Sequence, residues 1–167
     1  MKTSIAVMLF TLMHLLILAQ ENKEVEPSII ASLIGNDWVG EGNLMEQKAT
    51  FMMAWESLWE GKFIKLEFQN KRKGNDDNKI VFKAIASYKI GDDGKVLGNW
   101  FDSRGVSFPL RGTVKENMLT ILWGDVDSEN GKTIYLYKNN NVLVEDFILV
   151  NGRFSKFGNA TYIQNIK

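Results

Sequence analysis

The stretch Gly35-Asn36-Asp37-Trp38-Val39-Gly40-Glu41-Gly42 decides the fold, because an apolar segment ends there and the first of many strand-like segments begins. Gly40 and Gly42 remove side chains from one face of this strand and permit a strong bend. Trp38 is the only large side chain at the start of the bent strand. We expect it to plug the closed end of a β-barrel.

The residues after this stretch have the pattern of a β-meander. Residues 79–90 alternate with a period of two, which is typical of a strand with one face buried. Gly91–Gly94, Glu116-Asn117, Asn130-Gly131 and Asn151-Gly152 are hairpin signals. The predicted strands cover residues 38–44, 49–59, 62–70, 79–90, 96–101, 106–110, 112–115, 118–124, 133–138, 142–150 and 154–164, and residues 71–78 form a predicted solvated loop.

Short links favour a barrel over a sandwich. A Greek-key sandwich needs long crossover connections, whereas tight turns make sequence neighbours into sheet neighbours. We therefore predict an all-β protein with a single up-and-down antiparallel barrel of about ten strands. Side chains alone fill a barrel of about eight strands, so a cavity is expected here. Ser28 as N-cap and Gly35 as breaker predict a short N-terminal helix over the apolar residues between them.

Composition narrows the class of protein. The chain has 45% hydrophobic and 24% charged residues, as globular domains do. Lys plus Arg equals Asp plus Glu, at 20 each, so no charge bias points to nucleic acid or to an anionic membrane. A chain of 167 residues is long enough for one domain with its own core.

The N-terminal residues have the features of a signal peptide. Lys2 precedes an apolar run over residues 5–18, and Ala19 is a small residue at the expected cleavage point. A membrane anchor is the competing interpretation, but the run is shorter than the roughly 20 residues a span requires. We predict a signal peptide over 1–19, a disordered leader over 20–27, a barrel domain over 28–167, and a secreted or periplasmic location.

The chain offers little for catalysis. It has no cysteine, and its single histidine, His14, lies in the predicted signal peptide. We therefore expect no enzyme and no cofactor, since an ordinary triad needs a histidine or a cysteine. Glu56 and Glu145 could in principle act as an acid and base pair of the glycosidase kind. A weak surface calcium site at Asp125, Asp127 and Glu129 is a further hypothesis.

Two short motifs resemble those of a known group of barrels. Leu33-Ile34-Gly35 followed by Trp38-Val39-Gly40-Glu41-Gly42 resembles the opening of lipocalin-like (calycin) barrels, although two residues rather than one separate Gly35 from Trp38. Gly98-Asn99-Trp100-Phe101-Asp102-Ser103 resembles the W-x-D-S segment of secreted bacterial calycin-like proteins of uncharacterised function. The resemblance implies a small apolar or amphipathic ligand inside the barrel. It also implies that Arg153, near the start of the last strand, packs on Trp38. Haem binding through histidine is not implied, because the mature chain has none.

Candidate ligand-binding residues come from several strands. Thioethers and indoles accommodate varied apolar ligands, so a group of methionines and tryptophans could line a pocket, although core packing is the favoured interpretation for any single one of them. The group is Met45, Met52, Met53, Trp55, Trp59 and Met118. Aromatic residues in the middle of later strands could converge inside one barrel. Arg104 or Arg111 paired with Glu145 could orient a ligand, although each could equally be a solvated surface charge. The candidate set is Met53, Trp55, Phe82, Trp100, Arg111, Trp123, Tyr135, Glu145 and Phe147.

Three functions remain open at this point. The first is a secreted or periplasmic binding protein that holds a small apolar or amphipathic molecule in the barrel. The second is a non-catalytic interaction or inhibitor barrel that acts through its loops, with a lumen filled by aromatic side chains. The third is a barrel enzyme that uses carboxylates.

Overall fold

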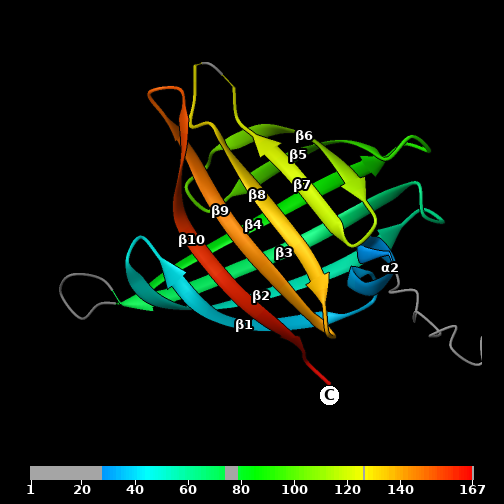
Figure 1. The fold of residues 1–167 in the computed structure, drawn as a ribbon, viewed down its shortest axis with the longest axis horizontal. Coiled ribbons are helices and arrows are strands. Elements are labelled where there is room, and N and C mark those ends of the chain that lie inside the picture. Colours follow the sequence, from blue (N-terminus) through cyan, green and yellow to red (C-terminus); the bar gives the residue numbers. More distant parts are fainter. Residues whose placement is uncertain (1–27, 74–78, 126, 167) are drawn as a thin grey trace, which may run out of the picture.

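The chain forms a closed antiparallel barrel of ten strands (Figure 1). The computed structural model describes residues 28–73, 79–125 and 127–166. The predicted signal peptide and leader lie outside these residues. The elements are α2 Ile29–Leu33, β1 Asp37–Leu44, β2 Gln47–Leu58, β3 Phe63–Lys73, β4 Lys79–Ile90, β5 Lys95–Asp102, β6 Ser107–Lys115, β7 Met118–Trp123, β8 Gly131–Lys138, β9 Asn141–Val150 and β10 Arg153–Gln164.

Each strand pairs with its sequence neighbour, and β1 closes the barrel by pairing with β10. The closing ladder runs from Trp38 opposite Gln164 to Leu44 opposite Gly158. Several links are tight turns whose residues have positive φ, among them Asn139-Asn140 and Asn151-Gly152. This backbone matches the right-handed twist of the flanking strands. The predicted up-and-down barrel with a short helix is therefore confirmed.

Helix α2 lies across one end of the barrel (Figure 1). Ser28 caps it, and the Ser28 Oγ accepts a hydrogen bond from the Ala31 N–H at 3.4 Å. Ile29 and Leu33 are fully buried in the core. The Ile29 N–H donates to the Glu116 carbonyl in the β6–β7 turn at 3.2 Å, which fixes the helix to the barrel rim. No helix within the described ranges is long and apolar enough to cross a membrane.

The predicted alternation over residues 79–90 is confirmed. Ala84, Ala86 and Tyr88 are buried in the barrel interior, and Ile85 between them is exposed. Successive side chains of a strand point to opposite faces of the sheet. The register with a neighbouring strand therefore identifies which side chains of that neighbour point into the barrel.

Most strand bounds differ from the prediction by one to three residues, and three of the differences follow from the strand pairing. Strand β3 continues to Lys73 because Arg72 and Lys73 pair with β4, so the loop begins later than expected. Residues 106–110 and 112–115 form the single strand β6, since Gly112 pairs on both sides without a break. Asn130-Gly131 is not a two-residue turn: Gly131 already pairs with Trp123, and residues 124–130 form the link.

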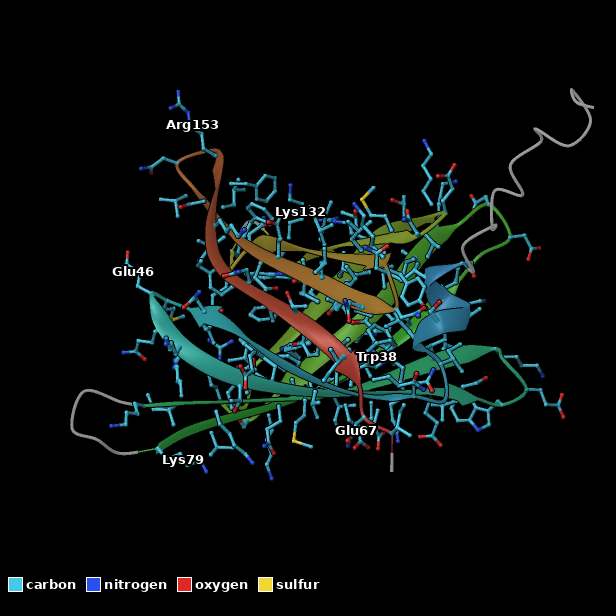
Figure 2. All side chains as sticks on the ribbon, turned by 60° about the horizontal axis from the view of Figure 1, so that its bottom comes forward. Trp38, Glu46, Glu67, Lys79, Lys132 and Arg153 are labelled. Atoms are coloured by element: carbon cyan, nitrogen blue, oxygen red, sulfur yellow. The ribbon has the colours of Figure 1, made fainter. Side chains whose placement is uncertain are left out.

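Trp38 lies where the sequence predicts, in the core at the helix-covered end. It is 2% exposed and belongs to the same cluster as Ile29 and Leu33. The implied packing of Arg153 on Trp38 is wrong. Arg153 is exposed and begins β10, whereas Trp38 is opposite Gln164 at the other end of that strand, as the two labels in Figure 2 show.

Candidate functional site

A cavity of about 720 Å³ opens at the end of the barrel opposite α2. Met45, Arg104 and Glu129 line it, and they come from the β1–β2, β5–β6 and β7–β8 links. These links lie at the rim away from Glu116, which anchors α2. The position agrees with an entrance at the end not closed by Trp38.

Ten of the residues that line the cavity are aromatic. Phe68, Phe82 and Trp100 make one group, with ring centroids 6.0 to 6.4 Å apart. Trp123 lies 6.0 Å from Phe108 in a second group. The full aromatic lining is Phe51, Phe68, Phe82, Tyr88, Trp100, Phe108, Trp123, Tyr135, Phe157 and Tyr162.

One carboxylate faces this aromatic wall. The Asp146 Oδ1 accepts a hydrogen bond of 2.7 Å from the Thr133 hydroxyl. The Thr133 Oγ1 in turn accepts a hydrogen bond of 3.2 Å from the Trp123 indole N–H. Burial raises the pKa of Asp146 to about 6, against the opposing effect of the Thr133 hydrogen bond. The group is therefore ionised at neutral pH at a free-energy cost.

Three tyrosines surround the inner part of the cavity. Tyr88, Tyr135 and Tyr162 are all buried and line the cavity. Tyr88 and Tyr135 lie close enough for each hydroxyl to affect the pKa of the other. Burial, together with the nearby charge of Asp146, raises the pKa of Tyr135 and of Tyr162 well above its usual value. These hydroxyls are neutral hydrogen-bonding groups at any physiological pH.

Asn70 adds a polar group that lacks a partner. It lies on β3, lines the cavity and is 4% exposed. Its Oδ1 receives no hydrogen bond from any residue in the described part of the chain. An unpaired buried amide oxygen costs about 1–3 kcal/mol, which a ligand donor would offset.

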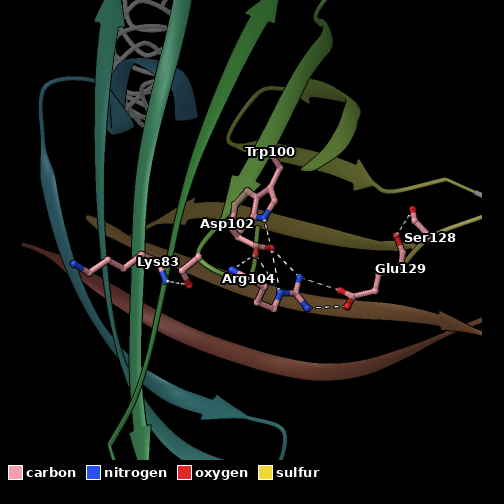
Figure 3. A network of polar contacts seen from close by, with 7 residues as sticks. Lys83, Trp100, Asp102, Arg104, Ser128 and Glu129 are labelled. Carbon is pink, nitrogen blue, oxygen red and sulfur yellow. Dashed lines mark hydrogen bonds and ion pairs between the residues drawn. The ribbon is translucent and has the colours of Figure 1, made fainter. Parts of the chain in front are cut away.

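A clamp of three charged residues holds the rim (Figure 3). The buried Asp102 carboxylate accepts hydrogen bonds from the Trp100 indole at 3.2 Å and from the Arg104 Nη2 at 2.8 Å. Arg104 extends to Glu129 on the β7–β8 link at 2.7 Å and lies 5.5 Å from the Phe82 ring centroid. Burial acts to raise the pKa of Asp102. The hydrogen bonds from Arg104 and Trp100 together outweigh burial, so the pKa of Asp102 lies below its usual value. The clamp thus connects a turn, a loop and two cavity aromatics.

Four of the predicted ligand-binding residues do line the cavity. Phe82, Trp100, Trp123 and Tyr135 come from β4, β5, β7 and β8 and meet there. Met53 and Trp55 point into the barrel but do not line the cavity. Trp55 packs in the closed half, where its ring stacks 5.5 Å from Tyr88 and meets Tyr135 edge-on at 5.6 Å.

Arg111, Glu145 and Phe147 are wrong as cavity residues. Arg111 is exposed on the outer face of β6. On β9 the inward side chains are Val144, Asp146 and Ile148, so their neighbours Glu145 and Phe147 point outward. Glu145 forms an ion pair with Lys156, and Lys132 lies 4.7 Å from the Phe147 ring centroid.

The other hypothetical sites are not assembled. Glu56 pairs with Lys65 at 2.6 Å and, like Glu145, does not line the cavity, so this carboxylate pair has no common pocket. Glu129 of the hypothetical calcium site is held by Arg104. Among the residues that the structure describes, no three acidic side chains are grouped so that they could hold a metal ion.

The cavity residues that the candidate set omits include Phe68, Asn70, Tyr88, Thr133 and Asp146. The signal that could have found Asp146 is the Asn139-Asn140 turn. A two-residue hairpin there places Lys138 opposite Asn141 and therefore Thr133 opposite Asp146. Comparisons with known proteins add no identification: no family model matches this chain, and no significant match exists among curated proteins.

Proposed function

We propose that this protein is a lipocalin-like binding protein, secreted or periplasmic, that holds a small apolar or amphipathic molecule in the barrel. The observation that carries the proposal is the cavity of about 720 Å³ with its aromatic wall and its opening away from α2. Binding sites for small molecules have volumes of about 300–1,000 Å³ and a mostly apolar lining with a few polar groups. The closed ten-strand barrel is compatible with the calycin architecture that the sequence motifs resemble.

The loop-only alternative is less well supported. It requires a lumen filled by aromatic side chains, and the aromatic residues here surround a space instead. The enzyme alternative relies on Glu56 and Glu145, and these two carboxylates share no pocket, since each is held by a lysine on the outer surface.

Binding of the apolar dye N-phenyl-1-naphthylamine tests the proposal. The dye gains fluorescence on entering an apolar site, and we expect saturable binding with one site per chain. Ile121→Trp is the test variant because Ile121 lines the cavity. Leu122→Trp is the matched control, since Leu122 is the next residue on β7 and is exposed on the outer face.

We expect Ile121→Trp to weaken dye binding about tenfold or more, because the added ring occupies ligand space, and Leu122→Trp to bind like the wild type. Thermal unfolding of both variants verifies that each is folded. Equal binding by the folded Ile121→Trp variant would place the dye elsewhere and refute the proposal, as would no saturable binding to the wild type.

A further inference from the structure

We propose that the cavity selects ligands that carry a protonated amine on an apolar body, with Asp146 as the counter-ion. The inference rests on the proposed binding function and names its ligand class. Asp146 faces the cavity and accepts one hydrogen bond, from Thr133, and none of the ion pairs found in the described ranges involves it. A buried carboxylate without a cation is costly, so a cationic ligand group gains by pairing with it.

The groups packed around Asp146 do not neutralise it. Thr133 and Tyr135 on β8 and Tyr162 on β10 are uncharged. The Trp123 indole donates to the Thr133 oxygen, which leaves the Thr133 proton directed at Asp146. The residues that the structure describes supply one donor to the Asp146 carboxylate, and its remaining lone pairs are open to the donors of an ammonium group.

The other charged residues that line the cavity are Arg72, Arg104 and Glu129, and each has a contact other than Asp146. Arg104 is held between Asp102 and Glu129. Arg72 is bonded to the Met45 sulfur at 3.5 Å, in the exposed part of the rim. Neither arginine is a partner of Asp146, so the inner cavity has negative charge and the rim carries mixed charge.

Two further features favour a cation over an anion. Aromatic rings line the cavity, and the faces of such rings attract ammonium groups through the ring quadrupole. The unpaired Oδ1 of Asn70 is a hydrogen-bond acceptor, and an ionised carboxylate ligand has no proton to donate to it. The pKa of Asp146 near 6 leaves it ionised at neutral pH, where aliphatic amines are protonated.

Isothermal titration calorimetry with three matched compounds tests the inference. Phenylbutylamine, phenylbutanol and phenylbutyrate share one apolar body and differ in charge. Near neutral pH we expect the amine to bind at least about tenfold more tightly than the alcohol and the carboxylate to bind most weakly. A tenfold ratio of dissociation constants corresponds to about one charge-assisted hydrogen bond. Between about pH 7 and pH 5 the amine affinity falls as Asp146 gains a proton, and the alcohol affinity stays constant.

Asp146→Asn and Glu145→Gln are the variant pair. Asparagine keeps an acceptor for Thr133 and removes the charge, so the amine should lose its advantage while the alcohol binds within about threefold of the wild type. Glu145→Gln removes a carboxylate from the adjacent outward position and should change no affinity.

The outcomes separate this inference from the binding function. If the alcohol binds and the amine gains nothing over it, or if Asp146→Asn keeps the amine preference, the amine inference is refuted and the container stands. If none of the three compounds binds and the naphthylamine dye also fails to bind, the container function is refuted.

Discussion

Replacing Asp102 by asparagine tests how much the rim clamp stabilises the barrel. The Asp102 side chain is fully buried, and it accepts hydrogen bonds from the Trp100 indole and from the backbone and side chain of Arg104. Hydrogen bonds to a charged group contribute about 1.5–3 kcal/mol each. Arg104 is 44% exposed and keeps Glu129, so its side-chain share is below about 1 kcal/mol. We expect Asp102→Asn to lower the free energy of unfolding by about 2–3 kcal/mol near pH 7.

The pH dependence of this loss is a second constraint. The folded-state pKa of Asp102 is below its unfolded value of about 3.9. The stabilisation by its charge is therefore present above about pH 4 and is lost as the pH falls through the folded-state pKa. The gap between wild type and Asp102→Asn should narrow on acidification, since asparagine does not titrate.

Urea unfolding followed by tryptophan fluorescence measures both quantities. The measurement is made near neutral pH and again at the lowest pH at which the wild type stays folded. Asp93→Asn is the control, because Asp93 pairs with Lys95 in an exposed hairpin and should leave the midpoint almost unchanged. Equal stability of Asp102→Asn and wild type near pH 7, or a gap that widens on acidification, would refute the assigned role of the clamp.

Three further predictions concern other parts of the barrel. Gly42→Ala should lower the free energy of unfolding in urea by more than about 3 kcal/mol, because a Cβ there would lie 1.9 Å from a backbone carbonyl oxygen. Gly152→Ala is the control: it has open space around its Cβ position and a φ of +74°, and it should cost about 1 kcal/mol. Asp146→Asn should stabilise the protein by about 1–3 kcal/mol at neutral pH, and this gain should disappear between about pH 6 and pH 4, since a raised folded-state pKa lowers stability as the pH rises. Leu33→Ala should lower the thermal midpoint, because the cavity it leaves under α2 reduces the free energy of unfolding by about 2–5 kcal/mol. A reduction below about 1 kcal/mol would mean that the packing of α2 does not stabilise the closed end of the barrel.

The barrel is predictable from the sequence because its signals are local and repeated. Alternation over residues 79–90 and turn residues such as Asn151-Gly152 fix neighbouring strands in order. Trp38 is found for the same reason, since it stands directly between the helix signal and the first strand. The implied contact between Arg153 and Trp38 fails because the resemblance gives only the order of these residues along the chain. A strand of 12 residues separates its two ends by the length of the barrel, and Arg153 lies at the end of β10 that is far from Trp38.

The cavity is only partly predictable because strand parity decides which side chains enter it. In β7, Leu119, Ile121 and Trp123 agree in parity, and Trp123 is assigned correctly. In β9 both faces are apolar, so alternation alone does not separate Glu145 from Asp146. The hairpin register that does separate them depends on a turn type, and an error of one residue there exchanges the two faces.

The pairing of β1 with β10 has a consequence for how the chain folds. This ladder joins Trp38 to Gln164, across almost the whole described length, so its contacts have the highest sequence separation among the strand pairs of the barrel. Contacts of such high sequence separation make folding slow, and until they form the two outer strands expose unpaired edges that can recruit other chains. Closure of this ladder is therefore a step at which misassembly competes with folding, and a substitution such as Gly42→Ala, which acts on this ladder, should reduce the yield of refolding more than its effect on stability alone requires.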